Sequence, residues 1–195
     1  MKVKICGITC SDDAAMCEDL GADALGFVHF PGRSRSLSLA AISEIGSSLG
    51  PVTSKVLVCR PSSVGESLAM LSDSGADVLQ LYSLEPDETS ELRDHGVKVL
   101  RVVRSSGDEA EKFASAVDAL VFEDGLPGTG VAYDYSGIPA RFCGRAFIAG
   151  GLTPENVHLA IALKPYGVDV SSGVETQLGR KDSTKVESFI RRCRA

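Results

Sequence analysis

The chain has 195 residues, of which 44% are hydrophobic and 24% are charged, as expected for one soluble domain. Its net charge of −6 argues against a general nucleic-acid or membrane-surface binder. A small anionic substrate stays compatible with this charge, because backbone amides can hold an anion locally.

The cysteines bear on metal binding and on the cellular compartment. No CxxC pair and no close Cys/His cluster occurs, so the spacing predicts no metal site. No apolar signal-peptide region and no apolar run of bilayer length occurs either. We therefore expect a cytoplasmic protein with free thiols. The six cysteines are Cys6, Cys10, Cys17, Cys59, Cys143 and Cys193.

The first predicted strand lies within residues 2–9. Val3 and Ile5 alternate with lysines, and Gly7 allows a sharp exit from the strand. Cys6 would therefore stand at the carboxyl end of a strand, beside bare backbone, where a thiol can meet a ligand. The alternative is that Cys6 is a small buried hydrophobic residue, which is the commonest role of a free cysteine.

A pattern of small residues, an Asp and a short apolar run occurs four times, at 21–28, 75–81, 116–122 and 166–170. It indicates a helix that ends and passes directly into a buried strand. We expect the Asp to accept hydrogen bonds from backbone amides at the strand entrance, at the end opposite the site. The four residues are Asp23, Asp77, Asp118 and Asp169.

Further strands are predicted at 54–59, 97–103 and 145–149. Helical spacing predicts helices at 12–20, 39–49, 63–74, 85–95, 108–115, 156–163 and 183–192. Thr153 and Pro154 read as the N-cap and first residue of the helix that includes 156–163. Strands and helices thus alternate about eight times without a linker, which predicts an α/β protein with one (βα)₈ TIM-barrel domain over residues 1–195. No GxGxxG motif follows the first strand, which weakens a dinucleotide-binding interpretation.

In such a barrel, functional residues follow the carboxyl ends of the strands. Arg33 and Arg35 follow the second strand and can hold a carboxylate or phosphate, or else form a solvated loop. The fourth strand offers Gln80 and Tyr82. The fifth strand offers Arg101 and Arg104, and any of these four can also be packing or rim residues.

The sixth predicted strand ends at Glu123 and Asp124. Adjacent residues of an extended chain point in opposite directions, so at most one of these carboxylates should enter the site. The glycine-rich stretch 125–130 that follows can close over a ligand or form a plain surface turn.

Glycine turns follow the last two predicted strands, at Gly150 and Gly151 and at Ser172 and Gly173. Bare backbone amides and helix starts at these places favour phosphate binding, which barrels often place after these two strands.

These features together resemble the phosphoribosylanthranilate isomerase family of tryptophan biosynthesis, over nearly the whole chain. The most specific matches are KICGIT at residues 4–9 and DVSSGVE at 169–175. Supporting matches are at 21–27, 77–81, 128–130, 149–152 and 154–157.

The resemblance implies an Amadori rearrangement of N-(5'-phosphoribosyl)anthranilate, with a Cys as general base, an Asp as general acid, and no metal or cofactor. Cys6 matches the base and Arg35 the residue that contacts the anthranilate part. Gln80 lies in a matching stretch and is a further expected substrate contact. The phosphate site matches Gly150, Gly151, Ser172 and Gly173.

The chain departs from the family pattern at two places. Spacing from residues 128–130 puts Glu123 at the acid position, with Asp124 as the alternative. The family commonly has Gln-Leu-His-Gly after strand four, where this chain has Gln80, Leu81, Tyr82 and Ser83. The alternatives to this isomerase are another phosphosugar isomerase or epimerase and a non-catalytic phosphosugar-binding barrel. We expect a phosphoribosyl substrate, no nucleic-acid or membrane partner, and a monomer or homodimer.

Overall fold

The short apolar segments of the sequence lie side by side in a computed structural model, which describes residues 1–105, 107–124 and 130–195. Within these residues, parallel strands β1 to β8 form a closed barrel in which β8 pairs with β1. The fold is therefore the predicted (βα)₈ barrel. Its strands are β1 (Lys2–Cys6), β2 (Ala24–His29), β3 (Ser54–Cys59), β4 (Val78–Leu81), β5 (Lys98–Val103), β6 (Ala119–Phe122), β7 (Ala146–Ile148) and β8 (Gly167–Val170).

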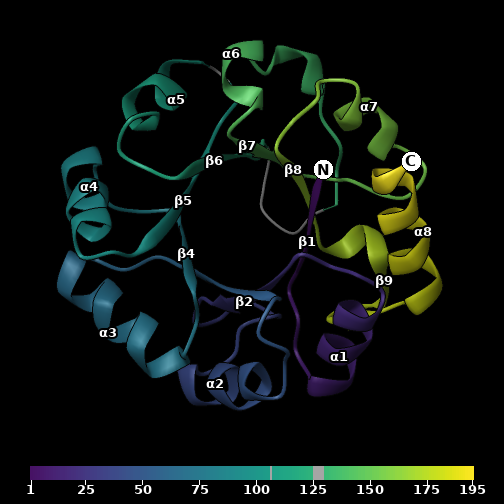
Figure 1. Ribbon diagram of the computed structural model, residues 1–195, viewed down its shortest axis with the longest axis horizontal. Helices are drawn as coiled ribbons and strands as arrows, with labels where there is room; N and C mark the ends of the chain where they lie inside the picture. Colours follow the sequence, from purple (N-terminus) through teal and green to yellow (C-terminus); the bar gives the residue numbers. More distant parts are fainter. Residues whose placement is uncertain (106, 125–129) are drawn as a thin grey trace.

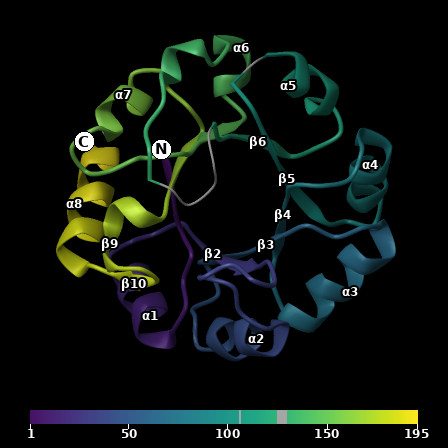
Figure 2. The ribbon, with the colours of Figure 1, turned by 180° about the vertical axis from the view of Figure 1, so that it is seen from behind.

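Helices surround the ring of strands, as Figure 1 and the opposite view in Figure 2 show. Short local signals set their ends: Ser63 accepts a hydrogen bond from Glu66 N at the start of α3, and Gly75 ends that helix in the left-handed conformation. The helices are α1 (Ser11–Asp19), α2 (Leu39–Ser47), α3 (Val64–Ser74), α4 (Pro86–Asp94), α5 (Gly107–Phe113), α6 (Ala140–Cys143), α7 (Val157–Ile161) and α8 (Ser183–Arg194). Within the described residues, none is long and apolar enough to cross a membrane.

The start of α7 differs from the expectation. Thr153 and Pro154 belong to a turn before the helix, and Asn156 is the residue that precedes the first helical position. The Asn156 side chain accepts a hydrogen bond from Thr153 N and donates one to Gly151 O. This turn ties α7 to the end of β7, so the helix begins one turn later than the Thr-Pro signal indicates.

Several short elements were not predicted. They are η1 (Tyr135–Gly137), α6, η2 (Ser172–Val174), and a hairpin of β9 (Glu175–Gln177) and β10 (Arg180–Lys181). Each has four residues or fewer, which is too short to show a hydrophobic period. The hairpin extends the segment after β8 and is held by Thr9, whose hydroxyl donates to Gly179 O at 2.5 Å.

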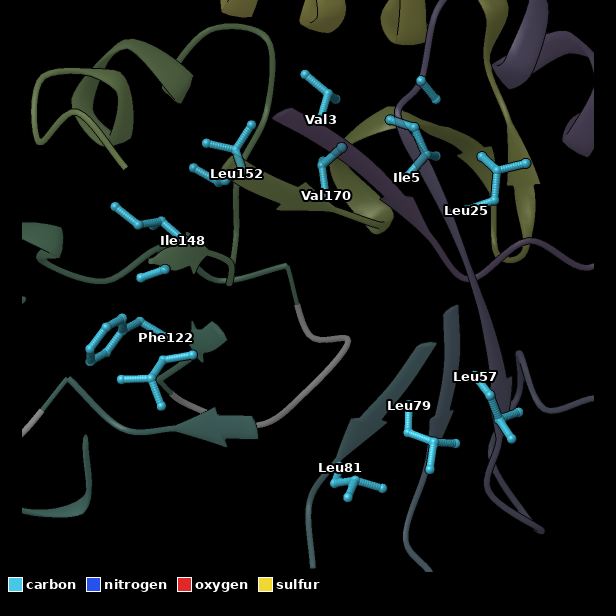
Figure 3. Packing of buried hydrophobic residues seen from close by; sticks show 14 of the residues in the cluster. Val3, Ile5, Leu25, Leu57, Leu79, Leu81, Phe122, Ile148, Leu152 and Val170 are labelled. Carbon is cyan, nitrogen blue, oxygen red and sulfur yellow. The ribbon is translucent and has the colours of Figure 1, made fainter. Parts of the chain in front are cut away.

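Alternate residues of each strand face two different cores. One core packs the strands against the helices and includes Leu25, Leu57 and Phe122, which Figure 3 labels. The other fills the barrel interior and includes Val56, Val58 and Phe147. The interior also encloses Lys4, whose side chain is fully buried. A closed, packed interior of this kind leaves room for a site only at the barrel ends.

The repeated Asp residues confirm the predicted role in three of four copies. At the strand entrances, Asp23 accepts from Val3 N at 2.8 Å, Asp77 from Lys55 N at 2.8 Å, and Asp118 from Val99 N at 3.0 Å. The prediction is wrong for Asp169. This residue lies within β8, beside Lys4 of β1, and its side chain enters the barrel.

Candidate active site

A cavity of about 580 Å³ opens at the carboxyl ends of the strands. It brings together most residues that the sequence singled out. Those in its wall are Cys6, Arg33, Arg35, Gln80, Tyr82, Arg104, Glu123, Asp124, Gly150, Gly151 and Ser172. Of the predicted stretch 125–130, residues 125–129 lie outside the described residues, and Gly130 lines the cavity.

Cys6 ends β1 and is partly exposed to this cavity. The next residue, Gly7, has φ +74°, and a Cβ there would lie 2.6 Å from Arg35 Cδ and 2.8 Å from Ser171 Oγ. Glycine therefore lets the loop after β2 approach the end of β1. Burial raises the pKa of the Cys6 thiol, and the nearby charges of Lys4 and Lys181 only partly oppose this rise.

A buried ion pair forms the floor beneath Cys6. Lys4 Nζ donates to Asp169 Oδ2 at 2.7 Å, with both side chains almost inaccessible to solvent. Gly26 makes this arrangement possible, because a Cβ there would lie 2.8 Å from Cys6 Sγ and 3.0 Å from Lys4 Nζ. Burial alone would lower the pKa of Lys4, but attraction to Asp169 and Cys6 keeps it above its usual value.

Glu123 follows β6 and points into the cavity. The Tyr82 hydroxyl, from the end of β4, donates to Glu123 Oε2 at 2.6 Å. Burial raises the pKa of Glu123, although the Tyr82 hydrogen bond opposes that rise. A carboxyl group with a raised pKa keeps its proton at higher pH and suits the role of an acid.

Asp124 also borders the cavity but is held by a different element. Its Oδ1 accepts from Ser105 N at 3.0 Å, and its Oδ2 accepts from the Ser105 hydroxyl. The two adjacent carboxylates therefore have different neighbours, although both residues line the cavity, whereas the alternation of an extended chain predicts that at most one enters it. Asp124 is thus held by Ser105, whereas Glu123 is held by Tyr82.

Arg35 lies in a buried charge network that links three segments. Its Nε and Nη2 donate to the two oxygens of Glu175, at 2.9 and 2.7 Å. Lys181 Nζ donates to the same carboxylate at 2.8 Å and to Cys6 O at 2.6 Å. Sequence reasoning missed Lys181. The available signal was its acceptor, Glu175, which is the last residue of the matched DVSSGVE stretch.

The glycine turns after β7 and β8 lie side by side. Gly150 and Gly151 have φ +89° and +66°. A Cβ on Gly151 would overlap the backbone of Ala132, and one on Gly173 would overlap Leu152 O. Close backbone packing thus requires glycine at both places, independently of any ligand. Ser172 lines the cavity, whereas Gly173 packs behind its wall.

Two buried oxygens facing this region have no hydrogen-bond partner within the described part of the chain. They are Gln80 Oε1 and Asp169 Oδ1, and both residues line the cavity. Orphaned acceptors of this kind are costly unless a ligand or water satisfies them. They therefore suit a ligand that carries hydroxyl groups.

Comparisons with known proteins agree with each other. The family model described as N-(5'phosphoribosyl)anthranilate (PRA) isomerase matches residues 3–192. The N-(5'-phosphoribosyl)anthranilate isomerases of Methanoregula boonei and Stutzerimonas stutzeri are 37% and 38% identical to this chain. They match 100% of it and 97% and 98% of their own lengths. The crystal structure of phosphoribosyl anthranilate isomerase from Thermus thermophilus superimposes with a TM-score of 0.88, at 35% identity and 98% coverage of both chains.

A further similar structure carries a ligand. It is a phosphoribosyl anthranilate isomerase in complex with reduced 1-(o-carboxyphenylamino)-1-deoxyribulose 5-phosphate, with a TM-score of 0.84 and 29% identity. The alignment covers 100% of this chain and 98% of that one.

Proposed function

The chain belongs to the N-(5'-phosphoribosyl)anthranilate isomerase family, and we propose that Cys6 and Glu123 are the base and acid of its reaction. The enzyme converts N-(5'-phosphoribosyl)anthranilate into 1-(o-carboxyphenylamino)-1-deoxyribulose 5-phosphate in tryptophan biosynthesis. The observation that carries the assignment is the shared cavity. The thiol after β1 and the carboxyl after β6 both line it, beside the glycine turns that follow β7 and β8.

The reaction begins with one proton given to the substrate and one removed from it. Glu123 protonates the ribose ring oxygen, the C1–O bond breaks, and the nitrogen lone pair forms an iminium with C1. Cys6, as thiolate, then removes the C2 proton, and the C–H electrons form the C1=C2 bond of an enol-amine. Proton loss from the C2 hydroxyl and proton gain at C1 give the ketone, so the substrate and product are isomers.

The other wall residues have supporting roles in this proposal. The arginine side of the cavity, at Arg35, takes the anthranilate part. Gln80 accepts from a ribose hydroxyl, since its Oε1 is unpartnered within the described residues. The turns at Gly150, Gly151 and Ser172 hold the phosphate through backbone amides and the serine hydroxyl, while Gly173 lets the two turns pack together.

The proposal also includes the cellular compartment and the assembly state of the enzyme. All six cysteines are free thiols, which suits the reducing cytoplasm. The assembly is a monomer or a homodimer, and a similar structure from Thermotoga maritima is described as monomers generated from a dimeric enzyme. Light scattering of the purified protein distinguishes the two states.

The direct test follows the loss of anthranilate-type fluorescence when purified protein meets freshly made substrate. We expect Cys6→Ala to abolish turnover with the fold intact. Glu123→Gln should lower kcat about 10²- to 10⁴-fold, the usual contribution of a general acid, while Asp124→Asn keeps most activity. The reverse pattern for the two carboxylates would reassign the acid to Asp124. Tight substrate binding without turnover by wild-type protein would support a non-catalytic barrel, and turnover of other phosphosugars alone would support a different isomerase.

A further inference from the structure

We propose that Tyr82 is a positioning residue that holds one oxygen of Glu123, so that the other carries the proton to the ribose ring. The proposal rests on the proposed function, because it assigns a partner to the general acid of that reaction. Tyr82 follows β4, at a position where the family pattern commonly has a histidine.

The two side chains meet in the cavity wall, although they follow strands that are not neighbours. Tyr82 and Glu123 lie 41 residues apart and follow β4 and β6, which are separated by β5 in the barrel. The hydroxyl donates to Glu123 Oε2 at 2.6 Å, a distance typical of an O–H···O hydrogen bond. With Oε2 engaged in this bond, Oε1 is left to carry the proton.

Glutamate needs such a restraint more than aspartate does. Its extra methylene adds a rotatable bond, and a misplaced catalytic group costs rate steeply. A tyrosine has only two side-chain torsions, and this ring is itself fixed. It packs edge-on against Phe30, with centroids 5.5 Å apart and planes at 77°. Phe30, Tyr82 and Glu123 thus form a continuous support from the end of β2 to the acid.

The charges around Glu123 make it possible to distinguish a positioning role of Tyr82 from simple packing. Burial raises the pKa of Glu123 and so does the charge of Asp169 in β8, whereas the Tyr82 hydroxyl, Lys4 and Arg104 oppose the rise. Tyr133 also lies within electrostatic range of this carboxyl group. Removing the Tyr82 hydroxyl alone removes a donor to the carboxylate. The pKa of Glu123 must therefore rise, although the ring and its contact with Phe30 remain.

The test compares wild-type protein with Tyr82→Phe. Carbon-13 NMR of protein labelled at the glutamate carboxyl carbons follows the titration, and the Glu123 signal is the one that Glu123→Gln removes. We expect Tyr82→Phe to raise the pKa of Glu123 and to lower kcat about tenfold or more, the scale of a displaced catalytic group, with KM little changed. Tyr166→Phe is the matched control. Its ring lies at the opposite end of the barrel against Phe147, and it should change neither quantity.

A double-variant cycle checks the same contact independently. Glu123→Asp shortens the acid so that it no longer reaches the hydroxyl, and adding Tyr82→Phe to it should cost little further activity. Wild-type turnover with an unchanged Glu123 titration in Tyr82→Phe would overturn the positioning role alone. Failure of wild-type protein to convert the substrate would overturn the proposed function, and the titration would still show whether Tyr82 holds Glu123.

Discussion

Lys4 shows how one residue sets the properties of its neighbours. Its ammonium group is fully buried, pairs with Asp169 at 2.7 Å and opposes the rise in the pKa of the Cys6 thiol. Either charge would be costly to bury without the other, so the stability of the pair depends on both partners. Lys4 therefore affects both stability and the reactivity of the proposed base.

We predict that Lys4→Met destabilises the protein by about 3–5 kcal/mol, since it leaves Asp169 buried without a partner. It also removes a positive charge near the thiol, so the pKa of Cys6 should rise further. Urea unfolding measures the first effect, and the pH dependence of Cys6 alkylation by iodoacetamide, read by mass spectrometry, measures the second.

The double variant Lys4→Met/Asp169→Leu serves as the control. It should recover much of the lost stability, because no unpaired charge remains in the barrel. A single variant as stable as wild type would show that the ion pair does not carry this energy.

At the scale of single residues, the sequence predicted the residues that line the cavity better than the residues that hold them in position. Cys6 and Gln80 follow from one rule, that strand ends face the site, and Glu123 follows from its spacing to the matched residues 128–130. Lys4 did not emerge, although the period of two puts it on the same face as Cys6 and would have revealed it. Tyr82 was noticed as a departure, but its contact with Glu123 depends on the distance across the barrel, which no local pattern encodes.

Single charged residues also tie whole elements together. The carboxylate of Glu175, at the start of β9, receives donors from Arg35 in the loop after β2 and from Lys181 in β10. Burial by itself would raise the pKa of Glu175, but these two cations bring it below its usual value of 4.5. The contact holds the hairpin after β8 against the first half of the barrel.

We predict that this network gives a stability that depends on pH. Because the pKa of Glu175 is lower in the folded state, its contribution is full well above pH 4.5 and is lost as the pH falls through the folded value. Wild type should therefore be more stable than Glu175→Gln at pH 7, and the gap should shrink toward pH 3. Thermal unfolding of both proteins across this range provides the measurement. A gap that is constant with pH would exclude the ionised carboxylate as its source.

Elements with a repeated chemical signature were predicted well. Gly-Ala-Asp before an apolar run marks β2 and β4 because the glycine ends a helix and the Asp binds the neighbouring strand. The hairpin of β9 and β10 has no such signature. It exists because Thr9, Asp13 and Arg35 hold it from other parts of the chain.

On the scale of the whole molecule, the two ends of the barrel do different work. The cavity with Cys6 and Glu123 lies at the carboxyl ends of the strands. Asp23, Asp77 and Asp118 bind backbone amides at the other end. Changes at the second end should therefore affect folding without affecting turnover.

Asp118→Ala tests this separation. The change removes the acceptor of Val99 N and a partner of Lys98, so we expect the free energy of unfolding to fall by about 1 kcal/mol. The kcat/KM of the folded enzyme should stay at the wild-type value. Asp73→Ala, at an exposed position of α3, is the control for loss of one negative charge. A clear drop in kcat/KM for Asp118→Ala, measured well below its melting temperature, would contradict the separation.

The bond between Lys4 and Asp169 joins residues 165 positions apart. During translation, the first strand therefore leaves the ribosome long before its counter-ion is made. Until then its ammonium group has no counter-ion, and burying it alone would be costly. Ring closure thus requires the eighth strand, and a product that ends before it leaves Lys4 without a partner.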